Sequence, residues 1–316
     1  MTLNVAFQMD PLENLNIEED TTFRLAEEAS IRGYNLFYYS PQNLTFRENR
    51  VKALGQDLTV RRIVGDHFSL GRERLLDLGA EIDVVWLRQD PPFNMSYITN
   101  THLLDLIDEE TLVVNKPFWV RNYPEKLLVL KFPDITPNTM ITCSLEMVKN
   151  FQQENGDIIL KPLYGNGGSG VFKLEKGDPN LASLVEIFKE MSPDPFIVQK
   201  FIPDVSFGDK RIILVDGFPI GAINRVPQKG EIRSNMHVGG KAEKIDLSKR
   251  DIEICDVIGS VMRDKGQLLV GLDVIGGMLT EINLTSPTGI QELERFNNVN
   301  IAKLIWDKVE RKLELV

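Results

Sequence analysis

The chain has 316 residues, of which 42% are hydrophobic and 26% are charged, a composition typical of a folded protein with room for two or three lobes. Its formal net charge of −10 argues against a protein that binds nucleic acid or a membrane surface, because such proteins carry a basic face. No apolar run approaches the length of a membrane span, and two cysteines cannot form a disulfide framework. We therefore expect a cytoplasmic protein in which Cys143 and Cys255 are small apolar filler.

The first third of the sequence alternates short apolar runs with helical patterns. We predict strands over 3–9, 35–39, 82–87 and 111–114, with helices over 22–32 and about 98–107. Such alternation indicates a parallel sheet covered by helices on both faces. Asp10 and Arg88 each follow a predicted strand, at the carboxyl edge where open α/β sheets bind their ligands.

From about residue 119 the pattern becomes that of an α+β region. Lys126 lies on a helical stretch, and the remaining predicted elements are strands over 158–160, 171–174 and 196–199, a hairpin over 211–224, and helices over 181–189, 252–263 and 301–313. Residues 226–241 are polar and glycine-rich without any period. A structureless segment of this length is typical of a lid that closes over a bound substrate.

The most informative segment covers residues 270–289. Asp273 lies on one apolar strand, while Glu281 and Asn283 lie two residues apart on the next and so share a face. Two carboxylates and an amide form an all-oxygen ligand set that suits Mg²⁺ or Mn²⁺ rather than zinc. The alternative is a surface hairpin that carries three scattered polar residues.

The turn between these strands decides whether the three side chains converge. A two-residue loop, Gly276–Gly277, would pair Asp273 with Thr280 and turn Glu281 to the opposite face. A three-residue loop that also includes Met278 would pair Asp273 with Glu281 and match apolar positions across the hairpin. We predict the three-residue loop and, with it, a metal site.

A glycine-rich loop follows the short strand that carries Lys161. Residues 165–170 match G-x-G-x-x-G, but a strand rather than a helix comes next, which excludes a dinucleotide fingerprint. The lysine precedes the glycines, which excludes the Walker pattern. We predict a glycine turn between antiparallel strands whose N–H groups close over phosphates, with Lys161 as a point charge. The alternative is a flexible hairpin that binds nothing.

Together these segments resemble the ATP-grasp ligases and, within them, the bacterial glutathione synthetases. The resemblance covers nearly the whole chain, including Met9-Asp10-Pro11, Arg88 to Phe93, Asn115-Lys116-Pro117, Glu125-Lys126-Leu127, Lys161-Pro162-Leu163, Gly208 to Arg211 and Asn283 to Thr288. It implies an α/β and α+β protein, with an N-terminal open parallel α/β domain over residues 1–121. An ATP-grasp domain of two α+β lobes clasping ATP would follow over 122–316, with a glycine-rich lid at about 164–170 and a peptide lid at about 226–241.

The resemblance also implies roles for single residues. The expected catalytic residues are Arg211 and Arg225, and the expected metal ligands are Asp273, Glu281 and Asn283. ATP would be held by Lys126, Lys161, Gly165, Asn166, Gly167, Gly168, Gln199, Lys200, Phe201, Ile202 and Asp209. The second substrate would be held by Arg233, Asn235, Ser286, Thr288 and Gly289. The chain departs from the enterobacterial pattern at Gln89, Asn94 and Tyr164, which concerns the substrate side.

The implied reaction joins γ-L-glutamyl-L-cysteine to glycine and converts ATP to ADP and phosphate through an acyl phosphate, with Mg²⁺ or Mn²⁺ as cofactor. No protein nucleophile is needed, which fits a sequence without a convincing Ser–His or Cys–His arrangement. The resemblance suggests a homo-oligomer, a tetramer or dimer. Two alternatives stay open at this stage: another carboxylate–amine ligase of the D-alanine–D-alanine or glutamate type, and a nucleotide-binding regulatory relative without turnover.

Overall fold

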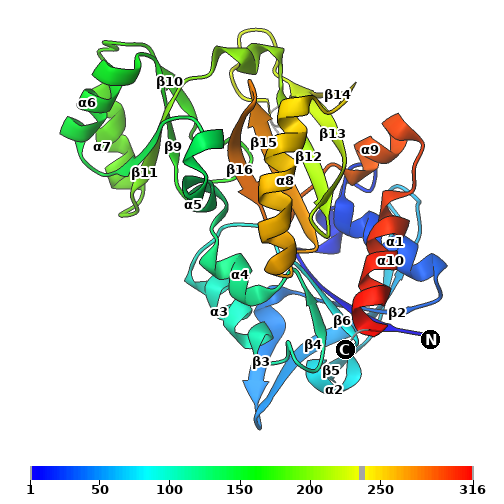
Figure 1. The fold of residues 1–316 in the computed structure, drawn as a ribbon. Helices are drawn as coiled ribbons and strands as arrows, with labels where there is room; N and C mark the ends of the chain where they lie inside the picture. The colour runs from blue at the N-terminus through cyan, green and yellow to red at the C-terminus, as the bar shows by residue number, and fades with distance from the viewer. Residues whose placement is uncertain (1, 235–238, 315–316) are drawn as a thin grey trace.

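The computed structural model describes residues 2–234 and 239–314 (Figure 1). These residues form a seven-stranded, a four-stranded and a five-stranded sheet. In Figure 1 the four-stranded sheet projects to the upper left, the five-stranded sheet occupies the centre and the seven-stranded sheet lies below. No helix of the described residues is long and apolar enough to span a membrane.

The seven-stranded sheet has the order β3-β4-β2-β1-β6-β7, with β5 paired to β4. Its parallel part consists of β1 (Asn4–Met9), β2 (Asn35–Tyr39), β6 (Val84–Arg88) and β7 (Leu112–Val114). Its helices are α1 (Thr21–Ile31), α2 (Leu78–Glu81), α3 (Met95–Asp105) and α4 (Pro117–Asn122). The Asp20 carboxylate caps α1 by accepting from the N–H of Phe23 at 2.6 Å. The predicted alternation of strands and helices around a parallel sheet is confirmed.

An antiparallel arm extends this sheet beyond the predicted strands. It consists of β3 (Leu44–Arg47), β4 (Arg50–Val60) and β5 (Phe68–Asp77), and β4 pairs antiparallel with β2. Along β4 buried Val51, Ala53 and Leu58 alternate with polar or exposed residues, so one face of the arm packs on the protein. The sheet is therefore mixed, whereas the sequence had indicated a parallel one.

The four-stranded sheet has the order β10-β9-β11-β8, with all its strand pairs antiparallel. It consists of β8 (Thr139–Thr142), β9 (Ile158–Pro162), β10 (Phe172–Leu174) and β11 (Phe196–Lys200), with α6 (Leu145–Asn155) and α7 (Leu181–Met191). A small separate core, which includes Ile158, Leu160 and Phe188, holds these helices on the sheet. The glycine-rich loop joins antiparallel β9 and β10, as predicted.

The five-stranded sheet has the order β14-β13-β12-β15-β16 and lies beside α8 (Lys249–Asp264) in Figure 1. Its strands are β12 (Asp209–Val215), β13 (Phe218–Val226), β14 (Lys241–Ile245), β15 (Leu269–Ile275) and β16 (Met278–Asn283). Ser248 and Asp251 form a capping box at the start of α8, which fixes where the helix begins. The short helix α5 (Glu125–Leu128) packs near the end of β16.

The hairpin of β15 and β16 has the predicted register but not the predicted loop. Asp273 pairs with Glu281, yet Ile275 pairs with Met278, so the loop is the two residues Gly276–Gly277. Both glycines have positive φ, +56° and +73°, which the primed turns of two-residue hairpins require. A β-bulge restores the register, because Thr280 is an extra residue whose hydroxyl donates to the Asp273 carbonyl at 3.1 Å.

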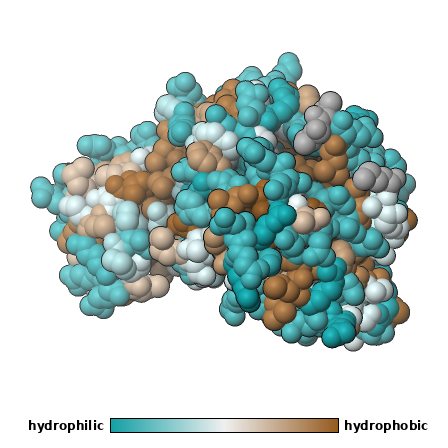
Figure 2. Space-filling view, turned by 90° about the horizontal axis from the view of Figure 1, so that it is seen from below, coloured by the Kyte–Doolittle hydropathy of each residue, from teal (hydrophilic) through white to brown (hydrophobic). Residues whose placement is uncertain are grey.

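Two helices from the C-terminal part of the chain, α9 (Ile290–Asn297) and α10 (Ile301–Glu314), pack against the seven-stranded sheet. The Trp306 ring lies edge-on to Trp86 of β6 at 5.6 Å between ring centroids, and its indole N–H donates to the Leu25 carbonyl at 2.9 Å. Val5 of β1 lies in the same core. Seen from below, the molecule shows hydrophobic atoms scattered among hydrophilic ones, with the left lobe projecting from the body (Figure 2).

Candidate active site

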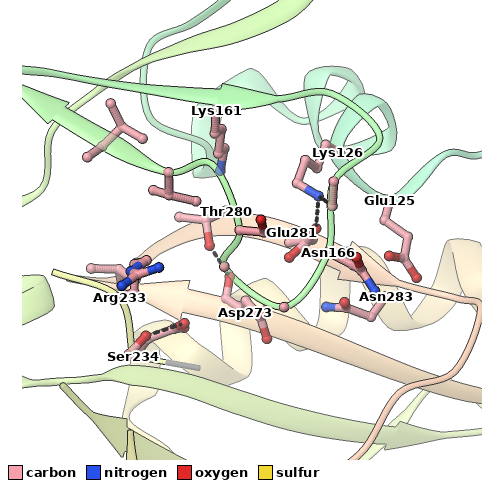
Figure 3. Close-up of a pocket in the computed structure, with 18 of the residues that line it drawn as sticks. Glu125, Lys126, Lys161, Asn166, Arg233, Ser234, Asp273, Thr280, Glu281 and Asn283 are labelled. Carbon is pink, nitrogen blue, oxygen red and sulfur yellow. Dashed lines mark hydrogen bonds and ion pairs between the residues drawn. The ribbon is translucent and has the colours of Figure 1, made fainter. Parts of the chain in front are cut away.

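A cavity of about 260 Å³ lies where the four-stranded sheet, the five-stranded sheet and the glycine-rich loop meet (Figure 3). Most of the residues selected from the sequence line it: Lys126, Lys161, Gly165, Asn166, Gly167, Gly168, Gln199, Lys200, Phe201, Ile202, Asp209, Arg211, Arg225, Arg233, Asp273, Glu281, Asn283, Ser286 and Thr288. Gly289 does not line the cavity and instead precedes α9 as its N-cap, with φ +116°. Asn235 lies outside the described residues.

The three expected metal ligands occupy one face of the hairpin. Asp273 and Glu281 are directly opposite one another, and Asn283 pairs with Gly271 two positions along. The Asn283 amide donates to the Gly271 carbonyl at 3.3 Å, which leaves its side-chain oxygen available. The hairpin thus directs three oxygen-bearing side chains into one cavity.

Asp273 is held by both arginines expected to be catalytic. Arg211 binds it with two bonds, Nε to Oδ1 at 2.5 Å and Nη2 to Oδ2 at 3.0 Å, and Arg225 Nη2 lies 3.0 Å from Oδ2. Arg225 also donates to Asp209 Oδ2 at 2.5 Å. Burial alone would raise the pKa of Asp273, but the charges of the two guanidinium groups outweigh it and lower this pKa below its usual range.

The pKa of Asp209 is raised, in contrast to that of Asp273. Burial and the nearby charge of Asp273 raise its pKa to about 6, although Arg225 acts to lower it. Ser234 donates its hydroxyl to Asp209 Oδ2 at 2.9 Å, which ties the segment after β13 to the cavity wall. The Oδ1 atom of Asp209 is buried and has no hydrogen-bond partner among the described residues.

The two expected phosphate-binding lysines enter the cavity above the strand that carries Glu281 (Figure 3). Lys126 Nζ lies 2.9 Å from Glu281 Oε1 and also donates to the Gly165 carbonyl in the glycine-rich loop. Lys161 Nζ donates to Gln199 Oε1 at 3.4 Å, and no carboxylate of the described residues lies within ion-pair distance of it. One lysine is therefore neutralised within the protein, and the other is not.

The pKa values of the lysines follow from these partners. Burial acts to lower the pKa of Lys126, but the charge of Glu281 and its hydrogen bond outweigh burial, so this pKa is raised. Burial dominates at Lys161 and lowers its pKa, although the charge of Glu281 opposes the shift. Lys161 is thus a desolvated cation without a matching anion.

The glycine-rich loop crosses the cavity from β9 to β10, and its Asn166 lines the cavity together with Glu281 and Asn283. Gly167 and Gly168 have consecutive positive φ values, +61° and +79°, a conformation that residues with a Cβ rarely adopt. This requirement explains the two adjacent glycines at the centre of the loop. The loop therefore presents bare backbone to the cavity.

Arg233 lines the cavity but its charge is engaged locally, because its Nη2 lies 2.6 Å from Glu231 Oε2. The expected peptide lid over residues 226–241 includes this pair and Ser234. Four of its residues, 235–238, lie outside the described residues.

The three departures from the enterobacterial pattern have structural contacts. Gln89 Oε1 accepts from the side chains of Gln8 at 3.2 Å and Asn100 at 3.1 Å. Asn94 caps α3, because its side chain accepts from the backbone N–H of residue 97 at 3.1 Å. Tyr164 stacks on Phe93 with ring centroids 6.1 Å apart. Tyr164 thus joins the start of the glycine-rich loop to the N-terminal part of the chain.

Glu125 is a cavity residue that the sequence did not single out. Its Oε1 accepts from the N–H of Leu284 at 2.8 Å, the N–H of Thr285 at 3.0 Å and the Thr285 hydroxyl at 2.9 Å. Burial raises its pKa, and the charge of Glu281 adds to the shift. Its position beside Lys126 in the quoted Glu-Lys-Leu motif was the available signal. Thr280 and Asp90 are further lining residues that were not predicted.

The hairpin fits a divalent metal by its chemistry. No group of three His, Cys, Asp or Glu side chains among residues 2–234 and 239–314 is close enough to hold a metal, so the set rests on two carboxylates and the Asn283 amide. Mg²⁺ is commonly held by one or two carboxylates, and substrate phosphates complete its shell. Lysine and arginine cations neutralise these carboxylates in the structure. The donors present therefore fit Mg²⁺ or Mn²⁺ that arrives with a nucleotide.

Two family models match the chain: the prokaryotic glutathione synthetase N-terminal domain over residues 3–121, and the prokaryotic glutathione synthetase ATP-grasp domain over residues 125–298. The curated glutathione synthetase of Brucella melitensis is 55% identical over 99% of this chain and 100% of its own length. That of Agrobacterium fabrum is 52% identical over 98% of this chain and 97% of its own length.

Solved structures of similar fold include D-cycloserine synthetase DcsG, with a TM-score of 0.67 and 14% identity over 97% of this chain and 99% of that one. The ATP-grasp ligase PsnB, in complex with a precursor variant, Mg and ADP, has a TM-score of 0.65 and 20% identity over 99% of both chains. These identities show the fold alone, and they confirm the expected ATP-grasp architecture. The chain belongs to the prokaryotic glutathione synthetase family and is an ATP-dependent carbon–nitrogen ligase.

Proposed function

We propose that the chain joins the cysteinyl carboxylate of γ-L-glutamyl-L-cysteine to the amine of glycine, forming glutathione, ADP and phosphate. The main support is one cavity that gathers three lysines, three arginines and an oxygen-rich hairpin, in a chain 55% identical to a curated glutathione synthetase. A carboxylate does not react with an amine in water at a useful rate. Transfer of the γ-phosphoryl group of ATP to the carboxylate gives an acyl phosphate, which the glycine amine attacks with release of phosphate.

ATP would lie across the cavity between the two smaller sheets. Lys126 and Lys161 would neutralise its phosphates, and the backbone N–H groups of Gly165, Asn166, Gly167 and Gly168 would close over them. The segment Gln199, Lys200, Phe201 and Ile202 would hold adenine through its backbone and apolar side chains. Asp209 has one carboxylate oxygen that has no partner among the described residues, which suits it to accept from a ribose hydroxyl.

Asp273, Glu281 and Asn283 would hold Mg²⁺ or Mn²⁺, which neutralises charge on the phosphate oxygens during transfer. A metal bound there would release the cations that pair with these carboxylates in the structure. Lys126 would exchange Glu281 for a phosphate, and Arg211 and Arg225 would exchange Asp273 for the anionic reacting group. The same positive charges would thus pair with protein carboxylates before ATP binds and with substrate anions during the reaction.

Arg211 and Arg225 would stabilise negative charge on the acyl phosphate and on the tetrahedral intermediate. Removing one such preorganised donor typically lowers the rate ~10²-fold or more. Arg233, Asn235, Ser286 and Thr288 would bind the peptide and the intermediate. Closure of the glycine-rich lid and of the 226–241 lid would exclude water, which would otherwise hydrolyse the acyl phosphate.

The test is ADP release from ATP and Mg²⁺ with γ-glutamylcysteine and glycine, omitting each substrate in turn. We expect release only when both are present, with glutathione identified by mass. Release with a different acid and amine would retain the ligase chemistry but overturn the substrate pair. Tight ATP binding without release for any pair would support a regulatory relative instead.

We further propose that the protein acts in the cytoplasm as a homo-oligomer, a tetramer or dimer, without nucleic-acid or membrane partners. The net charge of −10 supports the absence of polyanionic partners. Sedimentation-equilibrium analysis gives the subunit number directly, and a monomer at micromolar concentration would contradict the proposed assembly.

A further inference from the structure

The carboxylate of Glu125 holds a segment that lies 159 residues further along the chain. A single oxygen, Oε1, accepts all three hydrogen bonds from Leu284 and Thr285, at 2.8 to 3.0 Å. These two residues directly follow Asn283 at the end of β16. The carboxylate therefore fixes the main chain immediately after the hairpin that carries Glu281 and Asn283.

The adjacent residue, Lys126, contacts two other parts of the cavity. Its ammonium lies 2.9 Å from Glu281 Oε1 and donates to the Gly165 carbonyl in the glycine-rich loop. Figure 3 shows Glu125 beside Lys126, at the side of the cavity where Asn283 lies. The four-residue helix α5 thus connects the hairpin, the segment that follows it and the glycine-rich loop through two neighbouring side chains.

The segment held by Glu125 continues into residues 286–288, of which Ser286 and Thr288 are expected to bind the second substrate. Ser286 donates its hydroxyl to the Gln89 carbonyl at 3.3 Å, and the Pro287 carbonyl accepts from Arg88 Nη2 at 3.2 Å. The Thr288 carbonyl accepts from Arg211 Nη1 at 3.3 Å. A displacement at residues 284–285 would consequently reach the arginine that holds Asp273.

We propose that Glu125 is a positioning residue. It holds Lys126, the expected phosphate-binding lysine of α5, in the correct position relative to the β15–β16 hairpin and to residues 286–288. This inference deepens the proposed function and rests on it. The role requires an oxygen that accepts three hydrogen bonds and does not require the negative charge of the side chain. A glutamine at position 125 can supply that acceptor oxygen, whereas an alanine cannot.

The test compares Glu125→Ala with Glu125→Gln in the ligation assay. We expect the alanine variant to lower kcat about 10²-fold, because a displacement of about 1 Å in an aligned site costs that much. The glutamine variant should stay within about tenfold of the unmodified protein, since neutral hydrogen bonds are roughly half as strong as charged ones. Equal losses in both variants would show that the charge acts directly and would overturn the proposal. An alanine variant with unchanged kcat would overturn it as well.

A second readout does not depend on the acceptor substrates. ADP is titrated calorimetrically with and without MgCl₂, and the gain in ADP affinity on adding Mg²⁺ is compared among the variants. We expect Glu125→Ala to lose this gain and Glu125→Gln to keep it, because the gain requires Lys126 and Glu281 to be correctly placed relative to one another. The same gain in all variants would contradict the proposal. If the unmodified protein fails to ligate γ-glutamylcysteine and glycine, the proposed function falls while this titration still tests Glu125.

Two further variants separate positioning from a loss of folding. Thr285→Val removes one of the three donors and should lower kcat roughly fivefold, which keeps the proposal testable if Glu125→Ala does not fold. An unchanged kcat in Thr285→Val would count against it. Glu146→Ala is the matched control, because Glu146 lies exposed in the first turn of α6 and forms no ion pair among the described residues. It should leave both readouts unchanged.

Discussion

The two sheets that flank the cavity treat buried charge differently. On the five-stranded side, Asp273 is held by two arginines and Glu281 by Lys126. On the four-stranded side, Lys161 has the amide oxygen of Gln199 as its one hydrogen-bond partner among the described residues and lies beside a loop of bare backbone. On the first side Asp273 and Glu281 are paired with protein cations without a ligand, whereas Lys161 on the second side gains its balancing anion only when phosphate arrives. The cavity thus combines a preorganised wall with a wall whose charge is unmatched.

Neutralising the hairpin should have the largest effect. Glu281→Gln keeps the size of the side chain but removes a charge needed by both Lys126 and the proposed metal, so kcat should fall by at least about 10²-fold. Steady-state kinetics measures this loss, and thermal unfolding checks that the fold survives. Glu253→Gln, on the exposed side of α8, is the control and should behave as the unmodified protein. Near-normal turnover in Glu281→Gln would remove the metal assignment.

The two lysines should respond in opposite directions when each becomes methionine. Lys126→Met leaves Glu281 without its partner and should lower the free energy of unfolding by about 3 kcal/mol, since both side chains are largely buried. Lys161→Met removes a desolvated cation and should raise the free energy of unfolding. Urea unfolding without nucleotide measures both changes. Both variants should weaken ATP binding about tenfold. A stability change of the same sign in both variants would contradict the difference proposed between the paired Lys126 and the unpaired Lys161.

The lowered pKa of Lys161 predicts how ATP affinity depends on pH. The ammonium binds phosphate and is lost as the pH rises through its lowered pKa, so ATP affinity should begin to fall at a lower pH than an ordinary lysine allows. Lys161→Arg keeps its charge over this range and should flatten the profile. Fluorescence or calorimetric ATP titrations between about pH 7 and 10 test this. Parallel profiles for the two proteins would refute the assignment to Lys161.

The turn of the hairpin should be less tolerant than a turn in the four-stranded lobe. Gly276 and Gly177 both have positive φ, +56° and +85°, so alanine at either costs about 1–2 kcal/mol in backbone strain. A Cβ at Gly276 would also come within 2.9 Å of Asp204 and Ile202, whereas no atom of the described residues lies within 4 Å of a Cβ at Gly177. Gly276→Ala should therefore lower the melting temperature further. Equal shifts in the melting temperatures of Gly276→Ala and Gly177→Ala would mean that the hairpin turn moves to accommodate the added Cβ.

The smallest effect concerns the two thiols. Cys143, at the start of the four-stranded lobe, is exposed, which contradicts the expectation that it is small apolar filler. Cys255 of α8 is buried, and burial together with nearby acidic residues raises its pKa to about 12. An alkylating reagent at pH 8 should modify one thiol in the native protein and two in denaturant, as counted by mass. Native modification at Cys255 would show that α8 opens away from the five-stranded sheet.

The sequence predicted those parts of the fold that depend on local pattern. The parallel strands are continuous apolar runs, and the glycine turn lies between two such runs, so each could be recognised from a few residues. The predicted register of the β15–β16 hairpin was correct, because the match of apolar residues across it excluded the pairing of Asp273 with Thr280. Its loop was wrong, because a bulge at Thr280 depends on a hydrogen bond to the Asp273 carbonyl that no linear pattern announces.

The parts that escaped prediction depend on distant contacts. The antiparallel arm of β3, β4 and β5 alternates weakly and exposes much of its surface, so it carries little apolar signal. Helix α5 is only four residues long, too short for periodicity to show. The bond between Glu125 and Thr285 joins residues 160 positions apart. The resemblance selected most of the cavity residues, but the pairing of Asp273 with two arginines became visible only in three dimensions.

The shared core of the seven-stranded sheet and α10 has a consequence for synthesis on the ribosome. Val5 and Trp86 pack with Ile305 and Trp306, so the first strands complete the burial of one apolar face only after residues near 306 have been translated. At about 5–20 residues per second, that face stays partly uncovered for roughly ten seconds or more. During this interval the nascent sheet is exposed to aggregation and depends on the chaperones that bind apolar surface.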